Sequence, residues 1–121
     1  MDVLKLELPY PPSINHYYLR TRNGVILGKK GRSYREEVTI LCQHAKFMFP
    51  KECKLAVAIE LFPPDKRRRD IDNTLKALLD SMQHANIYAD DNQIDYLSIV
   101  RCEPVPKGKV LLVVTKMEHH H

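Results

Sequence analysis

Residues 55–84 read LAVAIELFPPDKRRRDIDNTLKALLDSMQH, and this stretch decides the fold. Residues 55–62 are too continuously apolar for an exposed strand, which predicts a strand in the centre of a sheet that ends at Pro63. Residues 71–84 carry apolar side chains at helical spacing, which predicts an amphipathic helix with Asp70 at its N-cap position. The apolar stripe of this helix consists of Ile71, Leu75, Leu78 and Met82. A basic loop therefore joins a central strand to a helix.

Three further strands are expected outside this stretch. Their residues combine strand-forming side chains with turn residues at both ends, over residues 3–8, 95–102 and 109–115. A turn is expected around residues 89–92, before the second of these strands. With the strand at residues 55–62, they would make a sheet of about four strands.

A second helix is expected before the central strand. Ser33 and Glu36 form a capping-box signature, which predicts a helix that begins at Ser33 and ends at Phe49. Residues 13–30 are polar and aromatic with two glycines, which predicts a long surface loop with a short strand at residues 25–27. The expected fold class is therefore α+β, with a mixed β-sheet of about four strands packed against two α-helices in a single domain.

The composition indicates one globular domain. The 121 residues are 44% hydrophobic and 28% charged, which is typical of a folded chain and far from the disordered regime. We expect the domain to span residues 1–117, because residues 118–121 resemble the end of a purification tag. The chain has no apolar run that could span a bilayer and no signal-peptide pattern, so we expect a cytoplasmic protein without a membrane partner.

The net charge of +4 suits a polyanionic partner, and the position of the charge is more informative than its sum. Lys66, Arg67, Arg68 and Arg69 stand directly before the helix start and would neutralise phosphates of a nucleic-acid backbone. Two carboxylates, Asp70 and Asp72 (the latter within residues 71–84), follow this run at once. Paired carboxylates stay ionised beside a compensating cation, and their hard oxygens suit Mg²⁺, with Mn²⁺ as a substitute. A metal ion next to bound phosphate indicates phosphodiester hydrolysis.

A third carboxylate would complete such a metal site. The turn supplies two candidates, and we prefer Asp91 to Asp90, although spacing alone does not rank two neighbouring aspartates. Asp72 and Lys76 are four residues apart on one face of the helix, so Lys76 would oppose negative charge that develops at the phosphate. Asn73 would orient a ligand. The catalytic set is then Asp70, Asp72, Asp91 and Lys76, with the three aspartates as metal ligands.

Each of these features has an ordinary alternative when it is taken singly. Asp70 and Asp72 would cap the helix and complement its dipole. Asp90 and Asp91 would belong to a turn, the basic run would be a solvated patch, and the Asp72–Lys76 pair would be a weak surface ion pair. Their conjunction in one part of the chain favours the nuclease. No glycine-rich phosphate loop is present, so we expect no nucleotide cofactor.

The same residues resemble the RusA family of Holliday junction resolvases, small endonucleases encoded by phages and prophages. Residues 8–18, LPYPPSINHYY, are similar to the family's P-P-S-x-N-x-x-Y segment. Residues 67–73, RRRDIDN, are similar to its R-R-D-x-D-N core, and the downstream Asp90-Asp91 pair is in place. The resemblance covers nearly the whole chain, and the R-R-D-x-D-N core with its preceding Pro-Pro-Asp is its most specific part.

This resemblance implies a function beyond what spacing and charge indicate. It implies a magnesium-dependent crossover junction endodeoxyribonuclease, with Asp70, Asp72 and Asp91 as metal ligands and Lys76 as the essential basic residue. It also implies a homodimer that recognises branched DNA by shape and makes paired nicks, in DNA recombination and repair. The predicted DNA-binding residues are Ser13, Asn15 and His16 in the first matched segment, and Lys66, Arg67, Arg68, Arg69 and Asn73 in the basic run and the core that follows it.

Two other functions remain open on the sequence. The chain would be a non-catalytic basic DNA-binding module if its aspartates only cap a helix, and metal dependence discriminates this from the nuclease. It would be a general or RNA-directed nuclease if the same acids served another substrate. No RNA-binding signature supports the latter.

Overall fold

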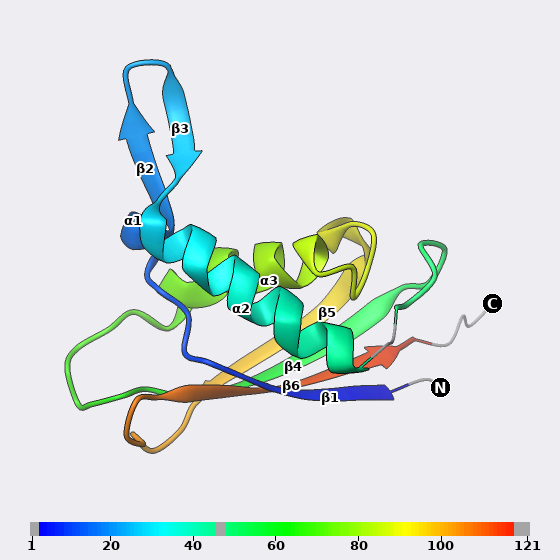
Figure 1. Ribbon diagram of the computed structural model, residues 1–121. Coiled ribbons are helices and arrows are strands. Elements are labelled where there is room, and N and C mark those ends of the chain that lie inside the picture. Colours follow the sequence, from blue (N-terminus) through cyan, green and yellow to red (C-terminus); the bar gives the residue numbers. More distant parts are fainter. Residues whose placement is uncertain (1–2, 46–47, 118–121) are drawn as a thin grey trace.

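The computed structural model describes residues 3–45 and 48–117, which form two layers (Figure 1). The elements follow one another as β1 (Val3–Leu8), α1 (Ile14–Tyr17), β2 (Tyr18–Thr21), β3 (Gly24–Leu27), α2 (Lys29–Ala45), β4 (Leu55–Phe62), the 3₁₀ turn η1 (Ile71–Thr74), α3 (Leu75–His84), the 3₁₀ turn η2 (Asp91–Gln93), β5 (Ile94–Arg101) and β6 (Lys109–Lys116). The region expected to be a tag lies outside the described residues.

A mixed sheet of four strands forms one layer, and α2 and α3 cover one of its faces (Figure 1). The strand order is β1-β6-β4-β5, with β4 parallel to β5 and the other neighbours antiparallel. The predicted strand at residues 55–62 is central, because it lies between β6 and β5. Alternate side chains of β4 enter the core, namely Leu55, Val57, Ile59 and Leu61. The mixed sheet with helices on one face confirms the expected α+β class.

The long helix α2 begins at Lys29, so the predicted start at Ser33 is wrong. The backbone N–H of Arg32 donates to the carbonyl of Gly28 at 2.8 Å, which already forms a helical turn before Ser33. Ser33 is an exposed residue inside the helix. The predicted end at Phe49 is also wrong, since the helix is described only to Ala45 and Phe49 is a buried core residue outside it.

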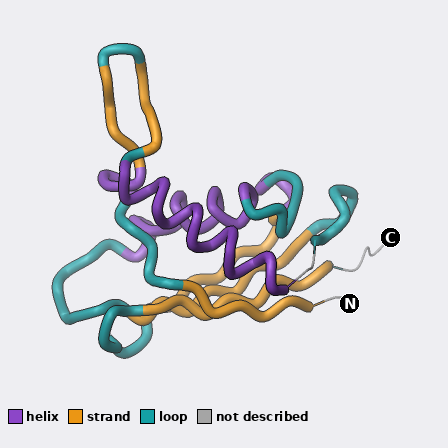
Figure 2. Tube along the Cα trace, in the orientation of Figure 1, coloured by secondary structure: helices purple, strands orange, loops and turns teal. Residues whose placement is uncertain are grey.

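A β-hairpin and a short helix occupy most of the segment expected to be a loop. The expected strand at residues 25–27 is confirmed within β3, which pairs with β2. The hairpin projects away from the two layers (Figure 2). The dipeptide Asn23-Gly24, with Gly24 at φ 122°, is the sequence signal that would have predicted this hairpin.

The connection from β4 to β5 contains η1, α3 and η2. Leu78 and Met82 of α3 are fully buried, whereas Ile71 at the start of the predicted stripe is 37% exposed. The stripe loses burial there because residues 71–74 form a 3₁₀ turn, whose three-residue period rotates Ile71 away from the core. None of the helices in the described residues is long and apolar enough to cross a membrane.

A close approach between two helices gives the first testable prediction. A Cβ atom on Gly31 of α2 would lie 2.3 Å from the carbonyl oxygen of Tyr17 in α1, so Gly31→Ala forces the two helices apart. We expect the free energy of unfolding to fall by about 1–3 kcal/mol, as in other overpacked sites. An unhindered Gly→Ala change in a helix would instead raise it by about 1 kcal/mol.

Urea unfolding measures this difference, with Ser33→Ala on the exposed side of α2 as the control. An increase in the free energy of unfolding for Gly31→Ala would contradict the close approach of α1 and α2.

Candidate active site

A pocket of about 440 Å³ joins the two sequence segments that the motif analysis selected. One wall comes from the proline-rich segment after β1 and the other from the basic loop after β4. The pocket contains these predicted residues: Ser13, His16, Arg67, Arg68, Arg69, Asp70 and Asn73. Residues that the sequence did not select also line it, among them Tyr10, Lys30 and Thr74. Thr74 is buried, and its Oγ1 has no hydrogen-bond partner among the described residues.

Two of the predicted DNA-binding residues lie outside this pocket. Asn15 is exposed on α1 and lines a separate groove with Tyr18 and Arg20 at the base of the hairpin. Lys66 lines a neighbouring pocket of about 300 Å³ together with Arg101 at the end of β5. The structure therefore distributes the predicted DNA-binding residues over three adjoining surfaces.

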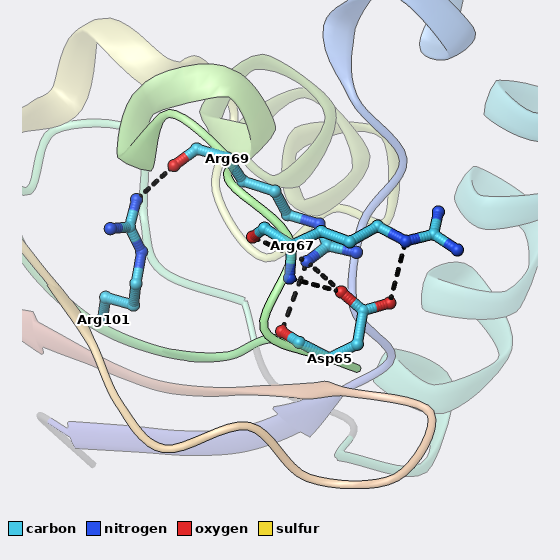
Figure 3. A network of polar contacts seen from close by, with 4 residues as sticks. All are labelled: Asp65, Arg67, Arg69 and Arg101. Atoms are coloured by element: carbon cyan, nitrogen blue, oxygen red, sulfur yellow. Dashed lines mark hydrogen bonds and ion pairs between the residues drawn. The ribbon is translucent and has the colours of Figure 1, made fainter.

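Asp65 organises the basic loop (Figure 3). Its Oδ1 accepts hydrogen bonds from the backbone N–H of Arg67 at 2.9 Å and from Nη1 of Arg69 at 2.7 Å. Arg101 Nη2 donates to the carbonyl oxygen of Arg69 at 2.5 Å, which ties the loop to the end of β5. The hydrogen bond from Arg69, followed by that from the Arg67 backbone, lowers the pKa of Asp65 to about 2. Because this pKa lies below the ordinary value, the contribution of these contacts to stability is complete at neutral pH and is lost only as the pH falls toward 2.

The three arginines of the basic run differ in their freedom to bind phosphate. Arg69 is only 24% exposed, forms the ion pair with Asp65, and lies with Cζ 6.0 Å from the centre of the Tyr10 ring. Arg67 is 83% exposed, with its Nε 3.7 Å from Asp65 Oδ2. Arg68 is exposed and has no ion pair among the described residues. Arg67 and Arg68 are therefore the arginines available to a polyanion, and Arg69 shapes the loop.

Asp70 and Asp72 stand at the start of the crossover from β4 to β5. Asp70 occupies the N-cap position of η1 in extended conformation, yet its side chain makes no capping hydrogen bond. Asp72 lies in the first turn of η1, and both residues are exposed. Asp70 therefore does not serve as a hydrogen-bonding helix cap, which was the alternative role considered for it. Two carboxylates are thus left facing solvent beside the basic loop.

Asp90 and Asp91 have different surroundings, which the sequence could not distinguish. Asp90 caps η2: its Oδ1 accepts from the backbone N–H of Asn92 at 2.9 Å, and Gln93 Oε1 accepts from the Asp90 backbone N–H at 3.1 Å. The carboxylate of Asp91 takes no part in this capping box, while its backbone N–H donates to Gln83 Oε1 at 2.9 Å. The turn alternative therefore applies to Asp90, and Asp91 retains a carboxylate for a ligand.

Within one chain, Asp91 lies far from Asp70 and Asp72. Asp70 and Asp72 precede α3, whereas Asp91 is attached to Gln83 at the other end of that helix. A helical rise of about 1.5 Å per residue separates Asp72 from Gln83 by roughly 16 Å. Oxygen ligands of one Mg²⁺ lie about 2 Å from the ion, and so within about 4 Å of one another. Accordingly, the described residues contain no group of three or more His, Cys, Asp or Glu side chains that could hold a metal ion.

A polar network connects α3 with α1 and α2, and the sequence analysis did not predict it. Asp80 accepts hydrogen bonds from the Tyr17 hydroxyl and from Arg35 Nη2. Burial acts to raise the pKa of Asp80, but the hydrogen bonds from Tyr17 and Arg35 and the charges of Arg35 and Lys76 bring it below the ordinary value. Asp72, Lys76 and Asp80 recur every four residues, which was the available signal. Lys76 is exposed between two carboxylates on one side of the crossover.

Comparison with known proteins gives one family and relatives of the same length. Residues 9–115 match the family described as endodeoxyribonuclease RusA. The chain is 36% identical over 118 residues to the crossover junction endodeoxyribonuclease rusA of Enterobacteria phage HK97, which covers 98% of each chain. It is 32% identical over 117 residues to the crossover junction endodeoxyribonuclease RusA of Shigella sonnei (strain Ss046) and to that of Escherichia coli (strain K12), with 97% of this chain and 98% of each relative covered.

The unequal environments of the arginines lead to a prediction about DNA binding. Arg67→Ala and Arg68→Ala should each flatten the dependence of log Kd on log salt by about one unit per lost phosphate contact. Arg69→Ala should change this slope less, because its guanidinium is already paired with Asp65. Fluorescence anisotropy with labelled DNA over a series of NaCl concentrations measures the slopes. Lys51→Ala is the control, since Lys51 is an exposed cation near the opposite end of β4.

A salt dependence that stays unchanged when both Arg67 and Arg68 are replaced would mean that these side chains do not contact the DNA backbone.

Proposed function

Because this chain belongs to the RusA family of endodeoxyribonucleases, we propose that it resolves four-way (Holliday) DNA junctions by paired phosphodiester nicks. The proposed setting is DNA recombination and repair in the cytoplasm, with Mg²⁺ as the metal ion and a homodimer as the active species. The names of the phage and bacterial relatives support the junction substrate. The observation that carries the proposal is the pocket in which the proline-rich segment and the exposed arginines adjoin Asp70.

The basic loop would hold the DNA backbone. Arg67 and Arg68 project from the pocket wall and would pair with phosphate oxygens by two parallel hydrogen bonds each. Ser13, His16 and Asn73 line the same pocket and would add neutral contacts to phosphate or sugar. Asn15 and Lys66 lie on the adjoining surfaces and would contact the flanking DNA.

The three aspartates would supply the metal ligands. Their hard carboxylate oxygens fit Mg²⁺ or Mn²⁺ in chemistry, and those of Asp70 and Asp72 are exposed and free of capping hydrogen bonds. Asp91 fits in chemistry but not in position within one chain. When bound, the ion would polarise the scissile phosphate and lower the pKa of a water molecule. The protein side chains would hold the phosphate in line with that water.

Lys76 would act on developing charge. It follows Asp72 by one helical turn, and its ammonium group is exposed on the same side of the crossover. The nearby charge of Asp80, itself fixed by Tyr17 and Arg35, would hold the Lys76 side chain in position. A cation placed in this way contributes mainly in the transition state, where negative charge on the phosphate is greatest.

The metal-ligand assignment predicts a separation of binding from cleavage. Asp70→Asn, Asp72→Asn and Asp91→Asn should each abolish nicking of a synthetic four-way junction in Mg²⁺, while junction affinity stays equal or increases, because each change removes negative charge near phosphate. Asp90→Asn is the matched control: Asn also caps helices, so nicking should persist.

Gel assays of nicking and electrophoretic mobility, with Mg²⁺ and with EDTA, make the comparison. Normal nicking by the Asp70→Asn and Asp72→Asn variants would contradict the metal site. Binding without metal-dependent nicking by the unsubstituted chain would instead support the non-catalytic DNA-binding module.

Lys76 gives a further prediction for the chemical step. Lys76→Ala should lower the single-turnover cleavage rate by about 100-fold, as when one donor to a developing oxyanion is removed, with a much smaller change in junction affinity. Lys76→Arg should restore little of the rate, because the broader guanidinium does not reproduce a compact ammonium ion. Equal losses of rate and affinity would assign Lys76 to simple backbone binding.

A further inference from the structure

The basic loop lines a second pocket besides the one that adjoins Asp70. This second pocket has a volume of about 300 Å³, and the end of β5 forms its other wall. Five cations and one carboxylate line it, namely Lys66, Arg67, Arg68, Arg69, Arg101 and Asp65. Asp65 is already paired with Arg69, so most of the positive charge is not balanced by the protein. An excess of positive charge in a concave surface fits a polyanion such as a DNA backbone.

The two pockets share a wall. Arg67, Arg68 and Arg69 line both of them, and the side chains of Arg67 and Arg68 are exposed. A DNA strand that crosses the basic loop would therefore place one phosphate in the pocket beside Asp70 and a nearby phosphate of the same strand in the second pocket.

Arg101 belongs to the second pocket and was not selected from the sequence. It is the last residue of β5, is exposed, and forms no ion pair with any described residue. Its Nη2 donates to the carbonyl oxygen of Arg69 (Figure 3). A guanidinium group has five N–H donors in a planar fork, and Nη2 carries two of them. Whichever hydrogen of Nη2 binds the carbonyl, one edge of the guanidinium keeps two parallel donors for a phosphate.

The contact between Arg101 and Arg69 holds the backbone of Asp70. The carbonyl of Arg69 and the N–H of Asp70 belong to one planar peptide group, so a hydrogen bond at the oxygen orients the bond that leads into Asp70. On the other side, the carbonyl oxygen of Asp70 accepts from the N–H of Asn73 at 3.2 Å. The backbone of Asp70 is thus held on both sides, while its carboxylate makes no capping hydrogen bond.

We propose that the second pocket binds a DNA phosphate near the scissile one, and that Arg101 is a positioning residue which links this phosphate to Asp70. One guanidinium group makes both contacts, so a phosphate in the second pocket fixes the peptide group before Asp70 and with it the carboxylate proposed for the metal ion. Because such coupling is reciprocal, a metal ion at Asp70 strengthens phosphate binding by the same factor. The identity of the phosphate rests on the proposed function, whereas the link from Arg101 to Asp70 can be tested without DNA or metal.

Inorganic phosphate tests this link by nuclear magnetic resonance. Titration of the ¹⁵N-labelled chain at constant ionic strength should give saturable shifts of the Arg101 Nε–H and of the Asp70 backbone N–H. In Arg101→Lys the Asp70 signal should no longer respond, because an ammonium group does not reproduce the planar fork. Arg32→Lys is the matched control, since the exposed Arg32 also donates to a backbone carbonyl, that of Leu27, at 2.9 Å. Its response should equal that of the unsubstituted chain.

The titration also has outcomes that would overturn the proposal. No saturable response of Arg101 would rule out phosphate binding in the second pocket. A response of Arg101 without one of Asp70 would rule out the link between them. A response of Asp70 that persists in Arg101→Lys would show that phosphate acts from the pocket beside Asp70 alone. Circular dichroism of each variant checks that it remains folded.

Methylphosphonate substitution tests whether DNA supplies the phosphate. One phosphate at a time on the nicked strand of a four-way junction is replaced by the neutral methylphosphonate. One position near the cut should lower the single-turnover rate by about 10- to 100-fold, as when a group that supports a metal ligand is lost. Arg101→Lys should lower the rate on unmodified DNA by a similar factor. The methylphosphonate at that position should then cause little further loss, because both changes break the same contact.

Arg32→Lys should keep the full position dependence in this assay. Independent, multiplying losses from Arg101→Lys and from the methylphosphonate at every position would overturn the contact between Arg101 and DNA.

Affinity and metal binding separate positioning from simple backbone contact. Arg101→Lys keeps its positive charge, so the dependence of log Kd on log salt for the junction should change little. Titration calorimetry with Mn²⁺ in the presence of the junction should instead show metal binding weakened by about 10- to 100-fold. Equal losses of junction affinity and cleavage rate, with unchanged Mn²⁺ binding, would overturn the positioning role. If the unsubstituted chain neither binds Mn²⁺ nor nicks a junction, the proposed function fails, while the phosphate titration still decides whether Arg101 links the second pocket to Asp70.

Discussion

The parallel pairing of β4 with β5 is the contact on which the rest of the arrangement depends. Two parallel strands that follow one another in the sequence require a crossover, because the chain must return from the end of the first strand to the beginning of the second. Here η1, α3 and η2 form this crossover. Residues at its start are brought to the carboxyl ends of the strands, and residues at its end to the amino ends. The distance between Asp72 and Asp91 is therefore a consequence of topology and not of a local loop conformation.

Gln93 anchors the returning end of this crossover. Its buried Oε1 accepts from the backbone N–H groups of Ala89 and Asp90, and its Nε2 donates to the carbonyl oxygens of Pro50 and Cys53 at 3.0 Å each. The side chain thus binds the turn before β5 to the segment before β4. Since a buried amide without these partners would cost about 1–3 kcal/mol, the four contacts fix the position of η2 and the backbone of Asp91 with it.

The periodicity of apolar residues in the sequence predicted the strands and helices of the two layers, because the buried side chains there recur with the period of each strand or helix. The continuous apolar run of residues 55–62 could only lie centrally, and Leu78 and Met82 are as buried as the helical spacing required. The start of α2 was mispredicted because the Ser33 signature is local, whereas helical hydrogen bonding already begins with Arg32 N–H and Gly28 O, next to the close approach of Gly31 to α1. The members of the site were selected by residue type and motif. Their distribution over two ends of the crossover could not be predicted, because it depends on which strands pair in parallel.

The acidic residues of the crossover region divide according to what their carboxylates contact. Asp65 is paired with Arg69, Asp80 is held by Arg35 and Tyr17, and Asp90 accepts a backbone hydrogen bond; these three stabilise the protein. In the described part of the chain, the other three carboxylates, those of Asp70, Asp72 and Asp91, form no ion pair and no side-chain hydrogen bond.

A carboxylate that the protein leaves without a partner keeps its charge and its lone pairs for a ligand from outside the chain. Sequence spacing alone could not separate the two groups, because both occur beside cations and turns. Their hydrogen-bond partners do separate them, and the three carboxylates left unpaired are those that the sequence analysis predicted as metal ligands. Since the topology holds Asp91 at the opposite end of the crossover from Asp70 and Asp72, the described residues of one chain do not gather all three carboxylates around one ion.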